Sequence, residues 1–204
     1  MPDRSPPGEP ADRAGAAFRR ELIDAIPHLR AFARGLCGRP DVADDLVQET
    51  MIRAWAARAR FVAGSNMRAW TFVILRNLYR TEMRRNRMRG DYDEAVAERI
   101  LVTEAGQEAP LHLSDMYKAL MRLPPERREA LLLVGAGGFS YEEAASICGC
   151  ALGTMKSRVA RARSALGEML EAGTLADDDG ELGGASTVAG TIMAQLARVA
   201  RAAS

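Results

Sequence analysis

The 204-residue sequence has no apolar run long enough to cross a membrane, so it predicts no transmembrane helix. Its three cysteines are an odd number, which argues against a disulfide framework. The stretch 1–10 is polar and proline-rich and predicts no export signal. We therefore expect a protein of the reducing cytoplasm. Aromatic residues make up only 5% of the chain, and the formal net charge of +1 does not by itself indicate a class of partner.

Alanine, leucine, arginine and glutamate are abundant, a mixture that favours helices. Apolar residues recur at helical spacing between glycine and proline breaks. The sequence predicts an all-α fold of two small helical domains joined by a flexible linker, the C-terminal one containing a helix-turn-helix. The expected segments are a disordered leader (1–15), a first domain (16–90), a linker (91–110), a second domain (111–172) and a tail that can form an amphipathic helix (173–204).

Three helices are expected in the first domain. Pro27 lies inside the first of them and is expected to kink or split it. The second helix begins after Pro40, and the third follows a loop at residues 61–66. The predicted inward residues are Phe18, Leu22, Ile26, Leu29, Ala33 and Leu36 on the first helix and Trp70, Val73, Ile74 and Leu78 on the third.

Residues 140–163 contain, in order, the features of a helix-turn-helix. Ser140 and Glu143 have the spacing of a capping box, which marks the start of a helix. Gly149 suits a tight turn, and residues 153–154 predict the start of the second helix, with Thr154 as its cap. The predicted inward residues are Ala144, Ala145 and Ile147 on one helix and Met155, Val159, Ala162 and Leu166 on the other.

The second helix of this motif is polar and cationic outside its apolar stripe. Such a helix can enter a major groove, where Arg and Lys donate to guanine and flanking cations hold phosphates. A solvated basic helix is the alternative, but the capping box and the turn glycine in the correct order favour DNA binding. The side chains concerned are Lys156, Ser157, Arg158, Arg161 and Arg163.

A second cationic segment lies between Arg68 and Arg89, where Glu82 is the only acid. Aromatic and amide groups are interleaved with the cations, and single-stranded nucleic acid is bound by this combination of stacking faces, polar groups and charge. The loop 64–67 can hold one base flipped out of its stack. The interleaved residues are Trp70, Phe72, Asn77 and Tyr79, with Phe61, Asn66 and Met67 just before them.

Plain core packing competes with nucleic-acid binding as an explanation for this segment. Core packing is favoured for Trp70 and Val73, and a polar contact is favoured for Asn66 and Asn77.

Four acids cluster earlier, at the start of the second helix: Asp41, Asp44, Asp45 and Glu49. The helix dipole is a sufficient reason for them, and a basic partner is the alternative.

In this order, the segments resemble the extracytoplasmic-function sigma factors over residues 18–170. The matching motifs are residues 44–55, 61–77, 123–131 and 153–158. The resemblance implies a transcription initiation factor with two partners, core RNA polymerase and promoter DNA. Residues 27–34 and 133–143 resemble the general-stress-response branch of this family. That branch implies inhibition by a small helical anti-sigma factor of the NepR type, which a response regulator with a sigma-like domain releases.

The resemblance also implies roles for individual residues. Polymerase contact falls on Asp44, Asp45, Gln48, Glu49 and Arg53. Contact with the unpaired −10 strand falls on Ala57, Phe61, Ser65, Asn66, Met67, Ile74, Asn77 and Arg80. Contact with the −35 duplex falls on Thr154, Lys156, Ser157, Arg158, Ala160, Arg161 and Arg163. Two departures from the family pattern are a longer tail after Gly173 and the small side chain of Ala160.

Three alternatives remain at this stage. A sigma mimic that sequesters an anti-sigma factor has no need for the cations of the recognition helix. An ordinary helix-turn-helix regulator leaves residues 44–70 unexplained. An enzyme is disfavoured because His28 and His112 lie far apart and no phosphate loop is present. The pair Cys148 and Cys150 is better explained as buried thiols than as a metal or redox site, so we expect no metal and no cofactor.

Overall fold

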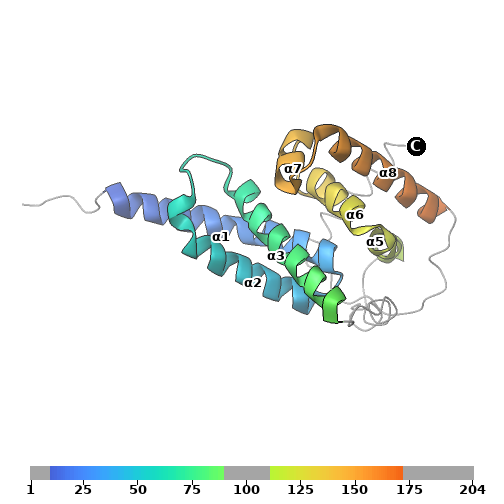
Figure 1. Ribbon diagram of the computed structural model, residues 1–204, viewed down its shortest axis with the longest axis horizontal. Coiled ribbons are helices and arrows are strands. Elements are labelled where there is room, and N and C mark those ends of the chain that lie inside the picture. The colour runs from blue at the N-terminus through green and yellow to red at the C-terminus, as the bar shows by residue number, and fades with distance from the viewer. Residues whose placement is uncertain (1–9, 90–110, 172–204) are drawn as a thin grey trace, which may run out of the picture.

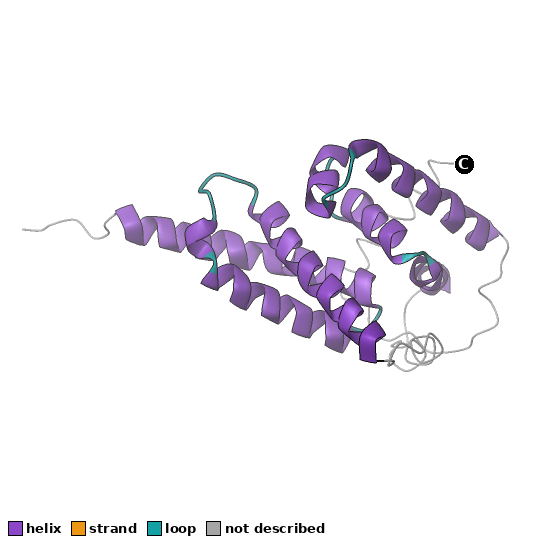
Figure 2. Cartoon of the chain, viewed as in Figure 1, coloured by secondary structure: helices purple, strands orange, loops and turns teal. Residues whose placement is uncertain are grey.

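The computed structural model describes residues 10–89 and 111–171, and within these ranges every regular element is a helix (Figures 1 and 2). The all-α prediction is therefore confirmed for this part of the chain. The predicted flexible linker and the predicted amphipathic helix of the tail lie outside the described residues. No helix within the described ranges is both long and apolar enough to cross a membrane.

The first domain contains α1 (Pro10–Cys37), α2 (Pro40–Ala56), the short 3₁₀-helix η1 (Arg58–Arg60) and α3 (Met67–Arg89). Helix α1 begins within the segment that was expected to be a disordered leader.

Helix α1 runs through Pro27 without a break, so the predicted split is wrong. Proline has no N–H group and leaves the carbonyl of Ile23 without its helical donor. Both Ile23 and Pro27 are exposed, so water can bind that carbonyl. Packing of the opposite face of α1 on α2 and α3 keeps the helix intact.

The predicted inward face of α1 is mostly confirmed, because Leu22, Leu29, Ala33 and Leu36 are buried and Phe18 and Ile26 are half-buried. The prediction for α3 is only partly right. Its four predicted inward residues are half-buried, and the fully buried face is formed by Thr71, Phe72, Leu75, Arg76 and Tyr79. The difference arises because α3 packs on two sides, against α1 and α2 on one and against the second domain on the other.

The second domain contains α5 (Leu111–Arg122), α6 (Pro125–Leu131), the π-helical turn η2 (Leu132–Ala136), α7 (Tyr141–Cys148) and α8 (Leu152–Glu171). The capping box is confirmed. Ser140 Oγ accepts from the Glu143 N–H at 3.1 Å, and Glu143 Oε2 accepts from the Ser140 N–H at 2.9 Å. Gly149 then ends α7 in the left-handed conformation, with φ of 61°.

The predicted cap of the recognition helix is wrong. Helix α8 begins at Leu152, and its first bond runs from the Met155 N–H to the Ala151 carbonyl at 3.0 Å. Thr154 therefore lies inside the first turn, where its carbonyl accepts from Ser157 Oγ at 2.9 Å. The inward residues predicted for α7 and α8 are confirmed as buried: Ala144, Ala145, Ile147, Met155, Val159, Ala162 and Leu166.

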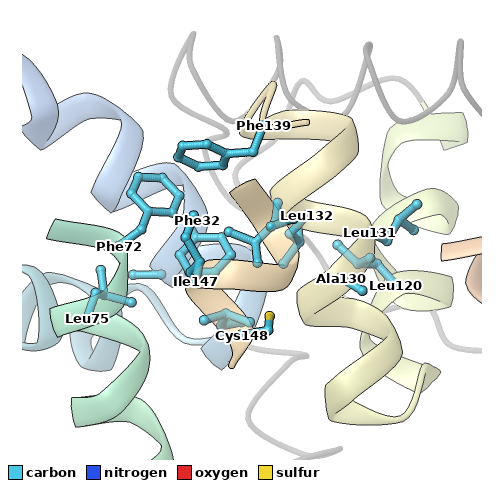
Figure 3. Packing of buried hydrophobic residues seen from close by; sticks show 14 of the residues in the cluster. Phe32, Phe72, Leu75, Leu120, Ala130, Leu131, Leu132, Phe139, Ile147 and Cys148 are labelled. Carbon is cyan, nitrogen blue, oxygen red and sulfur yellow. The ribbon is translucent and has the colours of Figure 1, made fainter. Parts of the chain in front are cut away.

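The two domains share one hydrophobic core (Figure 3). The ring of Phe72 on α3 stacks on Phe32 of α1 at a centroid distance of 4.7 Å, and its other contact is Phe139 of the second domain at 5.0 Å. At Gly35, a Cβ atom would approach Leu132 Cδ2 to 2.8 Å, so α1 and η2 pack closely here and a larger residue would require Leu132 to move. The sequence patterns within each domain did not indicate this closed arrangement.

The turn of the helix-turn-helix gives a test of the backbone argument. We expect Gly149→Ala to lower the free energy of unfolding by about 1–2 kcal/mol, because an L residue is strained at this positive φ. Gly153→Ala is the matched control, since an added Cβ would meet no heavy atom within 4 Å at either position and only Gly149 has positive φ. Urea unfolding measures both, and equal effects at the two glycines would contradict the assignment of the turn.

Candidate nucleic-acid interface

The outer face of α8 is the most open candidate surface for duplex DNA. The helix packs on α5, α6 and α7 through its buried stripe, with α7 preceding it across the turn at Gly149 (Figure 1). Of the seven residues predicted to contact the −35 duplex, four are exposed and three are half-buried. The exposed ones are Thr154, Lys156, Ala160 and Arg161, and the half-buried ones are Ser157, Arg158 and Arg163. Two cations next to a small residue can approach a groove without steric hindrance.

The loop before α3 is held by a side-chain cap. Asn66 Oδ1 accepts from the Ala69 N–H at 3.0 Å, and Asn66 Nδ2 donates to Glu143 Oε1 of the second domain at 3.2 Å. The polar contact predicted for Asn66 is thus made with protein in this conformation. Gly64 in the same loop has φ of 82°, a conformation that favours glycine.

Several residues predicted to contact the −10 strand are packed inside the first domain. Met67 is buried, and the rings of Phe61 and Trp70 lie 5.2 Å apart in the same small cluster. Ile74 packs against this cluster, and Ala57 ends α2. In this conformation Met67 offers no side-chain surface to a base, so a packing role explains it better. The exposed members of the predicted set are Ser65, Asn66, Asn77 and Arg80.

Several of the aromatic and cationic residues that the sequence suggested for binding a single strand are occupied by contacts within the protein. Phe72 is buried in the shared core, and the buried Tyr79 donates its hydroxyl to the Leu36 carbonyl at 3.2 Å. Arg76 is also buried, and its Nε lies 2.6 Å from Glu129 Oε1 on α6. Arg68 Nη2 donates to the Gly137 carbonyl at 2.6 Å. These contacts remove two cations from the exposed charge that the sequence indicated.

Three of the four acids near the start of α2 have partners within the first domain. Asp44 pairs with Arg30 at 2.9 Å and lies 3.7 Å from Arg34, so it ties α2 to α1. Glu49 pairs with Arg53 on its own helix at 2.6 Å. At the start of the helix, a hydrogen bond from Arg39 holds the pKa of Asp41 below its usual value.

Asp45 and Gln48 are exposed on α2, and Ile52 continues the same face one turn further along. Ile52 is 55% exposed, as Ile23 on α1 is at 54%. The sequence reasoning missed Ile52, although its spacing from Asp45 and Gln48 on the polar stripe was visible. Ile52 can therefore add an apolar contact to the polar groups of this face.

The cysteines and histidines form no recognisable metal site. Within residues 10–89 and 111–171, no group of three or more His, Cys, Asp or Glu side chains is placed to hold a metal ion. Cys148 is buried, and burial, with a smaller effect of the Glu129 carboxylate, raises its pKa to about 12. Partial burial, followed by the Arg68 charge, lowers the pKa of His28 below its usual value.

Within the described residues, an all-helical fold with a helix-turn-helix whose second helix carries exposed cations is typical of a DNA-binding protein. Two family models match it: Sigma-70 region 2 over residues 22–89 and Sigma-70, region 4 over residues 113–166. The chain belongs to the ECF RNA polymerase sigma factors, within the sigma-70 superfamily.

Individual relatives support the same family. The chain is 51% identical over 154 residues to the ECF RNA polymerase sigma factor EcfG of Rhodopseudomonas palustris, covering 76% of this chain and 85% of that protein. It is 40% identical over 125 residues to the ECF RNA polymerase sigma factor SigC of Mycobacterium tuberculosis, covering 61% and 68%. Among solved structures, it resembles the sigma factor RpoE in complex with the anti-sigma factor NepR from Bartonella quintana. The TM-score is 0.65 at 47% identity, and the match covers 76% of this chain and 97% of that one.

The environment of Cys148 gives a test by alkylation. Because the thiolate is the reactive form and the pKa of Cys148 is raised to about 12, we expect it to resist iodoacetamide at pH 8 in the native chain. Its half-buried neighbour Cys150 is the internal control and should react first. In urea both should react, and mass spectrometry of peptides measures each site. Joint protection of the two thiols that is lost on adding a chelator would instead support a metal pair.

Proposed function

We propose that this sigma factor docks on core RNA polymerase through α2, holds the unpaired −10 strand at the loop 61–66 and α3, and contacts the −35 duplex through α8. This assignment rests on the presence of sigma-70 region 2 and region 4 in one chain. Within that chain, α8 has exposed cations, and α2 has exposed polar and apolar side chains. The protein acts by binding, and a cytoplasmic location follows from its partners.

Duplex recognition is assigned to the exposed side of α8. Lys156 and Arg161 can donate to guanine edges or to phosphates, and Ser157 can donate to or accept from several bases. Ala160 makes room for close approach and adds an apolar contact. Together with the buried stripe that fixes the rotation of the helix, these groups allow the second domain to select a register on the duplex.

Strand capture is assigned to Ser65, Asn77 and Arg80, which are exposed in the first domain. Phe61 and Ile74, half-buried at the edge of the aromatic cluster, provide an apolar border for an unstacked base. Closed DNA does not offer unpaired bases, so binding them stabilises the melted state of the promoter. The first domain thereby contributes to melting without chemistry of its own.

Polymerase docking is assigned to the exposed face of Asp45, Gln48 and Ile52. Asp44 and Glu49, which were also predicted to contact polymerase, have partners within the first domain and are assigned mainly to holding α2 in place. Arg53, which was also predicted to contact polymerase, pairs with Glu49 and places a positive charge beside this face.

We also propose that a small helical anti-sigma factor of the NepR type inhibits this protein, and that its target genes belong to a stress response. The support is the similarity to RpoE, whose solved complex contains the anti-sigma factor NepR, and to EcfG. Direct evidence would be copurification of the chain with such an anti-sigma factor, together with release of the chain from polymerase when the anti-sigma factor binds.

Promoter recognition is tested by run-off transcription with core polymerase and a stress-type promoter library. We expect Lys156→Ala and Asn77→Ala each to reduce initiation about tenfold to a hundredfold, because a base contact contributes about 1–3 kcal/mol. Ser164→Ala, an exposed position further along α8, is the control and should initiate like the unmodified chain. Full activity of the double variant would refute the assigned DNA contacts, and no activity of the unmodified chain would favour a sigma mimic.

Polymerase docking has a closely matched pair of variants. Ile52 on α2 is 55% exposed and Ile23 on α1 is 54% exposed. We expect Ile52→Asp to weaken binding to core polymerase at least about tenfold, since an apolar anchor at an interface typically contributes about 2 kcal/mol or more. Ile23→Asp should leave the affinity unchanged. Titration of labelled sigma with core enzyme measures both, and equal losses would contradict docking through α2.

A further inference from the structure

We propose that Arg68 and Arg76 have two alternative sets of partners, groups of the second domain in the closed chain and phosphates of the −10 strand once the domains separate. Closure and strand binding then compete for the same side chains. This inference rests on the proposed function, because it requires that α3 lies along a single DNA strand.

Four arginines of α3 lie on a row of residues at four-residue spacing that winds slowly around the helix. Arg68, Arg76, Arg80 and Arg84 are separated by multiples of four residues, and Phe72 occupies the remaining position. Residues four apart are neighbours along a helix surface. Arg80 and Arg84 are exposed, whereas Phe72 and Arg76 are buried and Arg68 is half-buried. The second domain therefore contacts Arg68 and Arg76, whereas Arg80 and Arg84, which the winding of the helix carries away from it, stay exposed.

The polar contacts that cover these arginines use oxygen acceptors that DNA could replace, while Arg68 also lies over the Phe139 ring at 5.4 Å. Arg76 meets the Glu129 carboxylate at 2.6 Å, and Arg68 donates to the Gly137 carbonyl at 2.6 Å. Carboxylate and carbonyl oxygens occupy the positions that phosphate oxygens would take. Asn66, at the start of the same helix, donates to Glu143 at 3.2 Å. The second domain thus presents oxygen acceptors to three polar side chains of the strand-binding surface.

The closed arrangement leaves part of this arginine chemistry unused. Arg76 Nη2 and Arg68 Nε are buried and have no hydrogen-bond partner in the structure. A buried donor without a partner costs free energy, so the ionic contacts alone do not hold the domains together firmly. The apolar contacts, such as Phe72 with Phe139, supply the rest of the closing force. When the domains part, the arginines become accessible to water or to phosphates and can satisfy all their donors.

This competition predicts an asymmetry between the two partners of one salt bridge. If the bridge is only structural, removing either charge should affect DNA binding in the same direction. If Arg76 is shared, removing Glu129 frees it for the strand and strengthens binding. Removing Arg76 opens the domains but also deletes a strand contact, so binding should not strengthen.

The experiment measures binding of the full chain to a fluorescein-labelled single-stranded oligonucleotide by anisotropy, over a range of salt concentrations. We expect Glu129→Gln to bind about tenfold tighter than the unmodified chain, a change equivalent to about 1.4 kcal/mol. Arg76→Gln should bind no tighter. In a plot of log affinity against log salt concentration, the slope for Glu129→Gln should be steeper by about 0.7 for each additional phosphate that the protein neutralises. Adding Arg76→Gln to the same chain should make the slope shallower again by the amount that corresponds to one phosphate.

Glu126→Gln is the matched control, because it removes the same charge from an exposed position on α6 and should leave binding unchanged. Small-angle scattering of each variant measures domain separation, and circular dichroism checks folding. If Glu129→Gln does not fold, Phe139→Ala loosens the same interface without altering charge and should show the same tighter binding, again weakened when Arg76→Gln is added.

Three results would overturn the inference: no domain separation in either opening variant, no increase in affinity on separation, or an unchanged salt slope when Arg76→Gln is added. Run-off transcription by the unmodified chain is independent of these results. A chain that initiates transcription but shows no asymmetry retains its function as a sigma factor and loses only the sharing of Arg76.

Discussion

The packing of α3 between two domains is the constraint on which the other features of this structure depend. Its Phe72 ring contacts Phe32 of the first domain and Phe139 of the second, and the buried pair of Arg76 and Glu129 lies within the same interface. The loop assigned to strand capture immediately precedes α3. Its Asn66 donates a hydrogen bond to Glu143, and this contact couples the position of the loop to the second domain. The placement of the second domain therefore determines which polar groups of the first are accessible.

Local patterns in the sequence predicted the local structure well. The capping box at Ser140, the turn at Gly149 and the buried stripe of α8 depend on residues within a few positions of one another, and all three were correct. The predicted split at Pro27 failed because tertiary packing preserves the helix, and the carbonyl that lacks a donor belongs to the exposed residue Ile23. The cap assigned to Thr154 failed because a helix can begin without a side-chain cap, and here the first bond forms at Ala151.

Contacts between distant segments could not be obtained in the same way. Arg76 is one of many arginines in a basic segment, and nothing near it in the sequence distinguishes it from Arg80. It is buried because Glu129, 53 residues further along, supplies a carboxylate in the interface. The same limit applies to Met67, whose burial depends on Leu22 and Ala54. In contrast, the exposed set on α8 was predictable, since the buried stripe fixes the rotation of the helix and thereby its outer face.

An ion pair in the interface has a physical consequence that an apolar pair would lack. Replacing a buried ion pair by well-packed apolar residues is often neutral or even stabilising, so this pair is poorly explained as a means of maximal stability. On separation, however, exposed apolar side chains would lose the free energy of burial with no compensation, whereas Arg76 and Glu129 would regain hydration. The ionic pair thus makes closure specific in geometry while reducing the cost of opening. The shared hydrophobic core supplies most of the attraction between the domains, and the buried ion pair within it fixes their relative position while reducing the cost of separating them.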